Sequence, residues 1–221
     1  MAAVGTTAVR DALLRVGQAL EAHADRLTEL DQAVGDGDLG ITAHKMAAAL
    51  AAYAADEGAL AKAGGDPGSY LAQAGMAVNR AASSSLGTLL ATAAMRAGKE
   101  VRGLAELDAA ALARMLRAAS AGIQERGKAS LGDKTIVDVM HPAADAFATA
   151  VEAGAALPEA AGHMLAAAAR GRDEVTPLRS RIGRAGWVGD RTIGKVDPGC
   201  EAGVVILHAI VGAPAPREGT V

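Results

Sequence analysis

Large apolar residues recur at steps of three and four residues along the N-terminal part of the chain. This spacing puts them on one face of an α-helix, because a helix completes a turn every 3.6 residues. The series is Val9, Leu13, Val16, Leu20, Leu27 and Leu30, with His23 filling the remaining place. It predicts one long first helix, with His23 as a partly buried core residue rather than a catalytic one. The helix should end near Gly35, because Gly35 and Gly37 both weaken helical conformation.

Helical patterns recur through most of the remaining chain. Pro67 suits the first turn of a helix that follows Asp66, and Asp108 is a suitable N-cap for another. Residues 202–211 have some strand propensity, but no other segment offers a partner strand, which favours a helix. The further expected helices cover about 40–55, 67 onward, 89–97, 108–126, 135–153 with a kink at Pro142, 158–170 and 202–211.

The composition favours a core made by close helix packing. Apolar residues make up 51% of the chain, whereas aromatic residues make up only 2%. Such a core must consist of Ala, Leu, Val, Ile and Met, and alanine-rich sequences favour helices. With 221 residues and no visible repeat or linker, we expect a single all-α domain over 1–212. Residues 213–221, with two prolines, are expected to form a frayed tail.

Charge and cysteine content exclude several classes of function. The net charge of −3 gives no general attraction to nucleic acid or to an anionic membrane, and few aromatics are available to stack on bases. The single cysteine, Cys200, cannot form an internal disulfide. The N-terminus lacks a signal-peptide core, and charges interrupt the alanine-rich runs before they reach membrane-spanning length. We therefore expect a cytoplasmic protein without nucleic-acid or membrane partners.

Three aspartates stand close together where the first helix is expected to end, namely Asp31, Asp36 and Asp38. In a continuous helix Asp36 would point about 140° away from Asp31, and Asp38 would lie about 10 Å further along the axis. With the helix broken at the glycines the carboxylates can converge, and a cation must then offset their repulsion. Oxygen ligands without His or Cys suit Mg²⁺ or Ca²⁺, but the spacing does not match an EF-hand. These residues alone support a metal site and a solvated acidic turn equally.

Two glycine-containing loops in the middle of the chain are suited to anions, although each has a plain structural interpretation. The turn 83–88 offers hydroxyls and backbone N–H groups to phosphate oxygens, or serves only as a helix cap. The loop 127–135 carries Lys128 and Lys134, which taken singly indicate surface charges. Neither loop matches a Walker A or protein-kinase motif.

The stretch 179–199 has no helical period and is too long for an idle connector. Its Arg184 can pair with a phosphate or with a neighbouring carboxylate. Its Trp187 is interpreted as a core plug or as a cap on the loop.

In combination and in order, these segments resemble the nucleotide-binding L subunit, or domain, of dihydroxyacetone kinases. The resemblance extends from the first helix to the last and implies a barrel of about eight antiparallel helices with the nucleotide at one end. The motifs that carry it are Leu30-Asp31 with Gly35-Asp36-Gly37-Asp38, the Ser/Gly turn, Arg126-Gly127-Lys128 with Gly132-Asp133-Lys134-Thr135, Gly183-Arg184-Ala185, and Gly189-Asp190-Arg191-Thr192-Ile193-Gly194 through Asp197-Pro198-Gly199.

The resemblance also implies a set of ligand contacts. Asp31, Asp36 and Asp38 would hold two Mg²⁺ ions that bridge the phosphates of ADP or ATP. No residue would act as a nucleophile, and Arg184 is the candidate for a catalytic role. The implied nucleotide contacts are Leu39, Gly40, Ile41, Thr42, Ser84, Ser85, Leu86, Gly87, Gly127, Ile136, Arg184, Asp197, Pro198 and Gly199.

As a phosphoryl-transfer subunit, the chain would act with a separate K subunit that binds dihydroxyacetone or another ketose, and it would be inactive alone. The donor would be ATP, or a phosphotransferase-system protein that recharges a resident ADP. A homodimer is one option for its assembly. The chain departs from the family pattern at Leu39 and Lys195, where histidine is common, and in the Ser/Gly turn, which bears on the phosphate contacts and the ketose. The alternative function is a nucleotide-sensing regulatory module that docks on a partner protein without ketose kinase activity.

Overall fold

The computed structural model describes residues 4–215. Regular structure in this range is helical, apart from one β-bridge between Val4 and Leu107, which confirms the all-α prediction. The helices are α1 (Thr6–Ala22), α2 (Ala24–Val34), α3 (Leu39–Ala55), α4 (Glu57–Ala63), α5 (Pro67–Ala81), α6 (Ser85–Glu100), α7 (Ala109–Gly127), α8 (Val137–Glu152), α9 (Leu157–Val175), α10 (Gly183–Val188), the 3₁₀ helix η1 (Gly189–Thr192) and α11 (Pro198–Val211).

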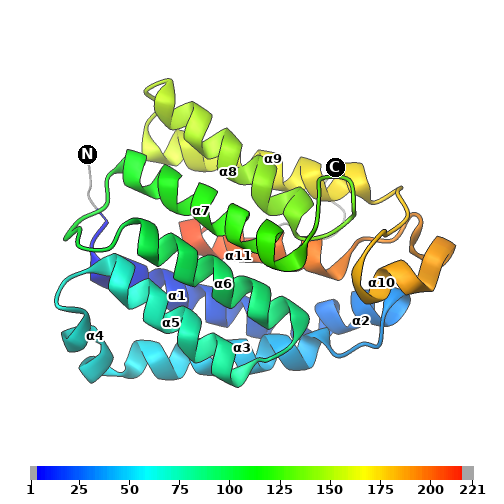
Figure 1. Cartoon of the computed structure of the whole chain (residues 1–221), viewed down its shortest axis with the longest axis horizontal. Coiled ribbons are helices and arrows are strands. Elements are labelled where there is room, and N and C mark those ends of the chain that lie inside the picture. Colours follow the sequence, from blue (N-terminus) through cyan, green and yellow to red (C-terminus); the bar gives the residue numbers. More distant parts are fainter. Residues whose placement is uncertain (1–3, 216–221) are drawn as a thin grey trace.

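The long helices lie roughly along one direction (Figure 1), and their packing closes them into a ring. Each packs against the next in the order α1, α3, α5, α6, α7, α8, α9 and α11, and α11 packs against α1 again. Chain direction alternates from each helix to its neighbour around this ring (Figure 1). Successive helices of the ring are therefore connected at alternating ends of the molecule, as in other antiparallel helix bundles.

Glycines on facing helices bring the helix backbones close together. A Cβ atom at Gly68 of α5 would lie 2.5 Å from the carbonyl oxygen of Gly98 in α6, and one at Gly98 would lie 2.3 Å from the carbonyl oxygen of Gly68. Only glycine fits on both sides of such a contact. These two glycines thus allow α5 and α6 to pack tightly against each other.

The interior of the ring is apolar. A cavity of about 590 Å³ is lined by aliphatic side chains and Phe147, with Arg15 as the charged residue of the lining. Hydrocarbon walls of this kind offer almost no partner to a phosphate or a metal ion. The polar chemistry of the chain must therefore be sought at the ends of the ring rather than inside it.

The predicted long first helix is interrupted at His23, which separates α1 from α2. The backbone hydrogen bonds continue through this point, from His23 N to the Ala19 oxygen and from Leu27 N to the His23 oxygen. However, His23 has φ −106° and ψ 7°, and its ring Nδ1 lies 2.8 Å from the Ala19 oxygen. A side chain that competes for a helical carbonyl bends the helix. His23 is half-buried, as predicted.

Several other element boundaries differ from the predictions. Helix α4 was not predicted, α6 begins at Ser85 rather than near residue 89, and α9 continues beyond residue 170 to Val175. The stretch 179–199 was predicted to be irregular but contains α10 and η1. Residues 202–211 are helical and Pro142 lies inside α8, as predicted. Most of the predicted tail, 216–221, lies outside the described residues.

Within the described range, no helix has both the length and the apolar character needed to cross a membrane.

Candidate metal and nucleotide site

Four loops that are far apart in the sequence lie at one end of the ring. Because the helices alternate in direction, the ends of α2, α5, α7 and α9 lie beside the beginnings of α3, α6, α8 and α11, at the right of Figure 1. The connecting loops are 35–38, 82–84, 128–136 and 176–197. The same four regions carried the motifs singled out in the sequence. Helix beginnings also present backbone N–H groups that no helical carbonyl satisfies.

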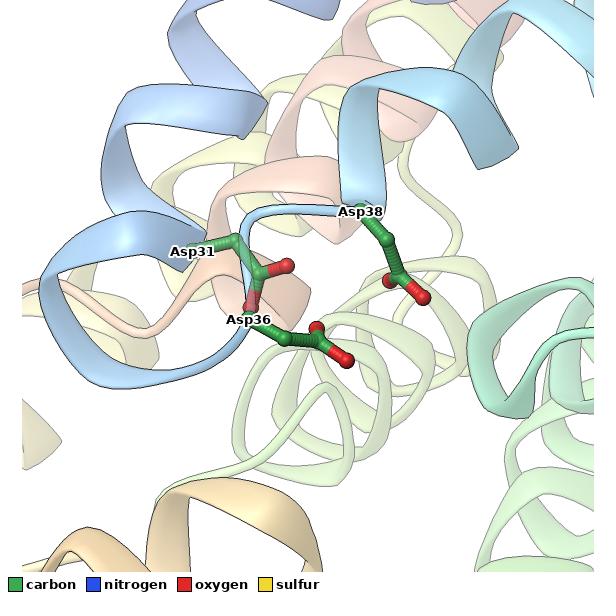
Figure 2. Close-up of side chains that lie close together, drawn as sticks. All are labelled: Asp31, Asp36 and Asp38. Atoms are coloured by element: carbon green, nitrogen blue, oxygen red, sulfur yellow. The ribbon is translucent and has the colours of Figure 1, made fainter.

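Asp31, Asp36 and Asp38, here called the aspartate cluster, converge at this end (Figure 2). Asp31 projects from the last turn of α2, Asp36 from the loop, and Asp38 from the position just before α3 (Figure 2). Each offers one carboxylate oxygen, and these oxygens all lie within 4.8 Å of one another. The helix break anticipated from the two glycines is therefore present, and it brings the three carboxylates together.

Two glycines make this convergence possible. Gly35 ends α2, and a Cβ atom there would lie 2.4 Å from the Oδ1 atom of Asp31, so any side chain would displace that carboxylate. Gly37 has φ +77°, a left-handed conformation that residues with a side chain rarely adopt. The chain therefore reverses within the four residues 35–38, which we call the acidic loop.

The carboxylate of Asp31 is also tied to the start of α3. Its Oδ2 atom accepts a hydrogen bond of 3.2 Å from the backbone N–H of Leu39. Burial raises the pKa of Asp31; the bond from Leu39 opposes this, and the neighbouring negative charges of Asp36 and Asp38 add to it. The crowding of the three carboxylates thus has an electrostatic cost that a cation would remove.

Arg184 of α10 supplies positive charge to the cluster. Its Nη1 atom donates to the Oδ2 atom of Asp38 at 3.0 Å, and it also pairs with Asp36. The hydrogen bond from Arg184 lowers the pKa of Asp36. All three side chains remain about half exposed, at 54% for Arg184, 52% for Asp36 and 46% for Asp38. A metal ion or a phosphate arriving from solvent therefore has direct access to these groups.

The donor set of the cluster suits a hard divalent cation. It consists of three carboxylates, two of them half exposed, with no His or Cys among them. Mg²⁺ prefers carboxylate oxygens and keeps several waters, and an open cluster leaves room for those waters. The residues present therefore fit Mg²⁺.

The four residues after the cluster, Leu39 to Thr42, form the first turn of α3. Leu39 and Thr42 are buried, with 9% and 5% of their surface exposed, whereas Ile41 is 58% exposed. At Gly40 a Cβ atom would lie 2.0 Å from the Thr28 hydroxyl and 2.5 Å from the Ala24 oxygen. Gly40 thus allows α2 and α3 to approach closely, so this turn can meet a ligand mainly through its backbone and Ile41.

The Ser/Gly turn is divided between capping and exposure. Ser84 is the N-cap of α6, and its hydroxyl accepts a hydrogen bond of 3.2 Å from Gly87 N. Leu86 and Gly87 are buried, Ser84 is partly buried, and Ser83 and Ser85 are exposed. The structural interpretation of the turn as a cap is therefore correct for Ser84, whereas Ser85 is the predicted contact whose hydroxyl is exposed to a ligand.

The remaining predicted contacts lie around the beginnings of α8 and α11. Ile136 is buried, and a Cβ atom at Gly199 would lie 3.6 Å from its backbone nitrogen, so the two positions adjoin. The carboxylate of Asp197 caps α11 by accepting from Cys200 N at 2.8 Å, and burial raises its pKa to about 6. Pro198 is buried, and Gly127 ends α7. Asp197 is thus already engaged in a structural role.

Sequence reasoning misplaced two residues at this end of the ring. Lys134 was interpreted as a surface charge, but its side chain is 1% exposed. Trp187 was interpreted as a core plug or a loop cap, but it is 93% exposed. A Gly-Asp-Lys-Thr loop gives no local signal that its lysine turns inward, because the partners of that lysine lie more than 40 residues away.

Comparison with known proteins identifies relatives that share most of the chain. Residues 33–212 match the model of the DAK2 domain. The chain is 30% identical over 196 residues to the ADP-binding subunit DhaL of PEP-dependent dihydroxyacetone kinase 2 from Listeria innocua, covering 89% of each protein. It is 28% identical over 198 residues to the corresponding Escherichia coli K12 subunit, covering 90% of this chain and 92% of the relative.

Longer proteins contain a similar region. The L-erythrulose kinase of Pectobacterium atrosepticum is 31% identical over 208 residues, which are 94% of this chain but 34% of the relative. The structure of the dihydroxyacetone kinase from C. freundii in complex with AMP-PNP and Mg²⁺ shares the fold, with a TM-score of 0.70 and 22% identity. This match covers 92% of the chain and 33% of that protein. On the family match and on the coverage of its relatives, the chain belongs to the DAK2 domain family.

Proposed function

We propose that this chain binds an adenine nucleotide as its magnesium complex and transfers a phosphoryl group to a ketose held by a partner subunit. The observation that carries the proposal is the convergence of three carboxylates and one arginine at the open end of an otherwise apolar ring. Phosphoryl transfer requires mainly positioning and neutralisation of charge, and it needs no nucleophile from this subunit. The names of the relatives, ADP-binding subunits of dihydroxyacetone kinases, support the same function.

In this proposal Asp31, Asp36 and Asp38 hold two Mg²⁺ ions, which neutralise the phosphate oxygens of the nucleotide. Arg184 now pairs with two of these carboxylates. With metal ions bound to these carboxylates, the Arg184 guanidinium would be available to a phosphate, for which its planar fork of N–H donors is well suited. Arg184 is therefore the residue that we assign to the developing charge on the transferred group.

We assign the nucleotide contacts to polar groups that make no hydrogen bond within the described part of the chain and to the residues beside them. We assign the phosphates to the exposed Ser85 hydroxyl and to backbone N–H groups at the beginnings of α3 and α6, between Leu39 and Thr42 and between Ser84 and Gly87. Gly127 and Ile136 are assigned to the base or ribose, with Pro198 and Gly199 beside them. Asp197 contributes by capping α11, which fixes the position of that neighbouring turn.

We assign the partner as a subunit that binds dihydroxyacetone or a related ketose, because the relatives are named as ADP-binding subunits of dihydroxyacetone kinases. The donor is either ATP or a phosphoprotein that recharges a bound ADP. Three relatives are named as PEP-dependent, which favours the recharged ADP. A homodimer remains an option for the assembly.

Thermal unfolding tests the nucleotide site. We expect Mg²⁺ with ADP to raise the melting temperature of the wild type, because a ligand that binds only the folded chain stabilises it. Asp36→Ala should abolish the increase. The absence of any ligand-dependent shift in the wild type would exclude the proposed site.

Mass spectrometry and a coupled assay test the reaction and the donor. Bound ADP that persists through purification and does not exchange with free ATP indicates recharging by a partner, whereas rapid exchange indicates direct use of ATP. Turnover of a ketose with a cognate substrate-binding subunit is expected. Nucleotide binding without turnover, even with that subunit, would instead identify the regulatory module considered above.

A further inference from the structure

Lys134 is a fully buried cation at the base of the segment that carries Arg184. Its side chain is 1% exposed, and its backbone has φ +63°, a left-handed conformation that is uncommon for a residue with a side chain. It lies in the loop 128–136 between α7 and α8, across from residues 176–194, which contain α10 and η1 and which we call the Arg184 segment. An inward-facing lysine in such a conformation must be held there by specific contacts.

The ammonium of Lys134 donates to three backbone carbonyl oxygens. The distances from Nζ are 2.8 Å to Thr176, 2.9 Å to Leu178 and 2.6 Å to Thr192. An ammonium has three N–H donors, so these contacts use all of them. Thr176 and Leu178 lie at the beginning of the Arg184 segment, and Thr192 lies beyond α10. The Lys134 side chain thus links the residues that precede Arg184 to the residues that follow it.

Further hydrogen bonds join the two ends of the Arg184 segment near Lys134. The Thr192 hydroxyl accepts from Ser180 N at 2.9 Å, and Gly194 N donates to the Thr176 oxygen at 3.0 Å. On the other side, the backbone of Arg181 donates to the Asp133 oxygen at 3.1 Å, next to Lys134 itself. The Arg184 segment is therefore a closed loop whose ends are fastened to the loop 128–136.

The loop that carries Lys134 is itself rigidly held. The carboxylate of Asp138, buried in the first turn of α8, accepts 2.5 Å and 2.7 Å hydrogen bonds from the backbone nitrogens of Gly132 and Thr135. These two residues flank Lys134 on either side. The anchor of the Arg184 segment is thereby fixed to the ring of long helices.

Burying an ammonium is costly, so its presence indicates a geometric requirement. Desolvation lowers the pKa of Lys134, and the nearby Asp197 partly offsets the effect. An aliphatic side chain would fill the same space without this cost, but it would leave three convergent carbonyl oxygens without donors. The desolvation cost of the Lys134 ammonium is therefore offset by its hydrogen bonds, which hold three backbone oxygens at one point.

We propose that Lys134 is a positioning residue for phosphoryl transfer, which fastens the base of the Arg184 segment and so keeps Arg184 against Asp36 and Asp38. The hydrogen bonds of the Lys134 ammonium all go to backbone oxygens of the Arg184 segment, so Lys134 acts on Arg184 through the backbone. Apart from this base, α10 and η1 pack mainly against α2 and against each other. This inference rests on the proposed function for the role of Arg184, but not for the anchoring itself.

The anchoring is tested without any ligand. In Lys134→Met, which retains the length of the side chain and removes the donors, we expect amide hydrogen exchange in residues 176–194 to become at least about tenfold faster. Exchange in α5 and α6 should be unchanged. Trp187, the single tryptophan of the chain, lies on α10 and should show lower fluorescence anisotropy. Lys128→Met is the matched control, because Lys128 also has positive φ on the same loop but is exposed.

A second variant guards against a general loss of folding. Lys134→Gln keeps two N–H donors, so it should fall between the wild type and Lys134→Met in the exchange of residues 176–194. Faster exchange that is confined to this segment supports the proposal. Unchanged exchange there, or an equal acceleration throughout all helices in both variants, overturns it.

The functional role is tested by a double-mutant cycle with the Mg²⁺ complex of ADP. Lys134→Met should weaken binding about tenfold, and adding it to Arg184→Ala should cause little further loss, because Lys134 acts through Arg184. A purely structural role predicts additive losses, which would overturn the proposal, as would wild-type affinity in Lys134→Met. If the wild type itself fails to bind, the proposed function is wrong, and the exchange measurement still decides whether Lys134 anchors the segment.

Discussion

The acidic loop and the Arg184 segment meet at the same ion pairs but are built in opposite ways. The acidic loop spans 35–38, and the contacts that shape it come from its own neighbours, such as the bonds from Gly35 N to the Asp31 oxygen and from Leu39 N to the Asp31 carboxylate. The Arg184 segment spans 176–194, and its conformation depends on Lys134, which is 42 residues away from Thr176 in the sequence.

The two loops should therefore differ in how firmly their conformations are held. The acidic loop follows from two glycines and two helix ends, so it should persist whenever α2 and α3 are folded. The Arg184 segment depends on a few polar contacts at its base, and segments with few buried apolar contacts open most readily. In the proposed function, the acidic loop would be the fixed metal-binding side and the Arg184 segment the side that opens to admit a nucleotide.

The largest effect should come from breaking the frame of the acidic loop. In Gly40→Ala the new methyl would meet the Thr28 hydroxyl and the Ala24 oxygen, so α2 and α3 must separate. We expect a loss of about 3 kcal/mol or more in the free energy of unfolding, measured with urea. Gly162→Ala in α9 is the control, because its Cβ would meet nothing within 4 Å, and it should be neutral or slightly stabilising. Equal stability of the two variants would contradict this account of the close approach.

A pH effect should come from Asp197, which follows the Arg184 segment. Its folded pKa of about 6 lies above the value of about 3.9 in an unfolded chain, so between these values the folded chain holds a proton that the unfolded chain has released. Stability should therefore fall as the pH rises from 4 to 6, by up to about 3 kcal/mol at about 1.4 kcal/mol per pKa unit.

Asp197→Asn tests this because asparagine also caps helices but does not ionise. The loss of stability between pH 4 and 6 should be smaller in this variant than in the wild type, as measured by urea unfolding at each pH. Asp108→Asn replaces an exposed aspartate cap on α7 and serves as the control. Parallel profiles for the wild type and Asp197→Asn would rule out the titration of Asp197 in this range.

A moderate effect is expected inside the base of the Arg184 segment. Thr192→Val keeps the shape of a fully buried side chain but removes its hydrogen bonds with Ser180 N and the Gly189 oxygen. Leaving a buried donor without a partner costs about 2 kcal/mol. Amide exchange in 176–194 should report this loss, and Thr149→Val, at an exposed position of α8, should not reproduce it. Unaltered exchange in Thr192→Val would mean that the Thr192 hydroxyl does not help to hold the base.

The acidic loop could be predicted from the sequence, whereas the anchoring of the Arg184 segment by Lys134 could not. The break at Gly35 and Gly37 is a matter of backbone conformation, so the convergence of the three aspartates could be inferred from the residues themselves. The inward turn of Lys134 could not, because it depends on carbonyls that only the closed ring brings within reach. The bend at His23 was missed for a related reason, since one side chain there competes with a helical hydrogen bond that periodicity cannot reveal.

The smallest effect should distinguish Ser84 from Ser85 in the Ser/Gly turn. Ser84→Ala removes the cap of α6 and should cost about 1 kcal/mol of stability, whereas Ser85→Ala should stay within about 0.5 kcal/mol of the wild type. The proposed phosphate contact gives the reverse order for ligand affinity, with Ser85→Ala weakening the binding of Mg²⁺ and ADP more. The same order in both measurements would remove Ser85 from the proposed site.

Calorimetric titration of the chain with ADP, with and without Mg²⁺, tests most directly whether the aspartate cluster holds the nucleotide through metal. We predict binding by the wild type that requires Mg²⁺, loss of that binding in Asp36→Asn, and its retention in Glu29→Gln, which removes an exposed carboxylate from α2 outside the cluster. ADP binding of equal strength without Mg²⁺, or in Asp36→Asn, would contradict the assignment of Asp31, Asp36 and Asp38 as the metal ligands.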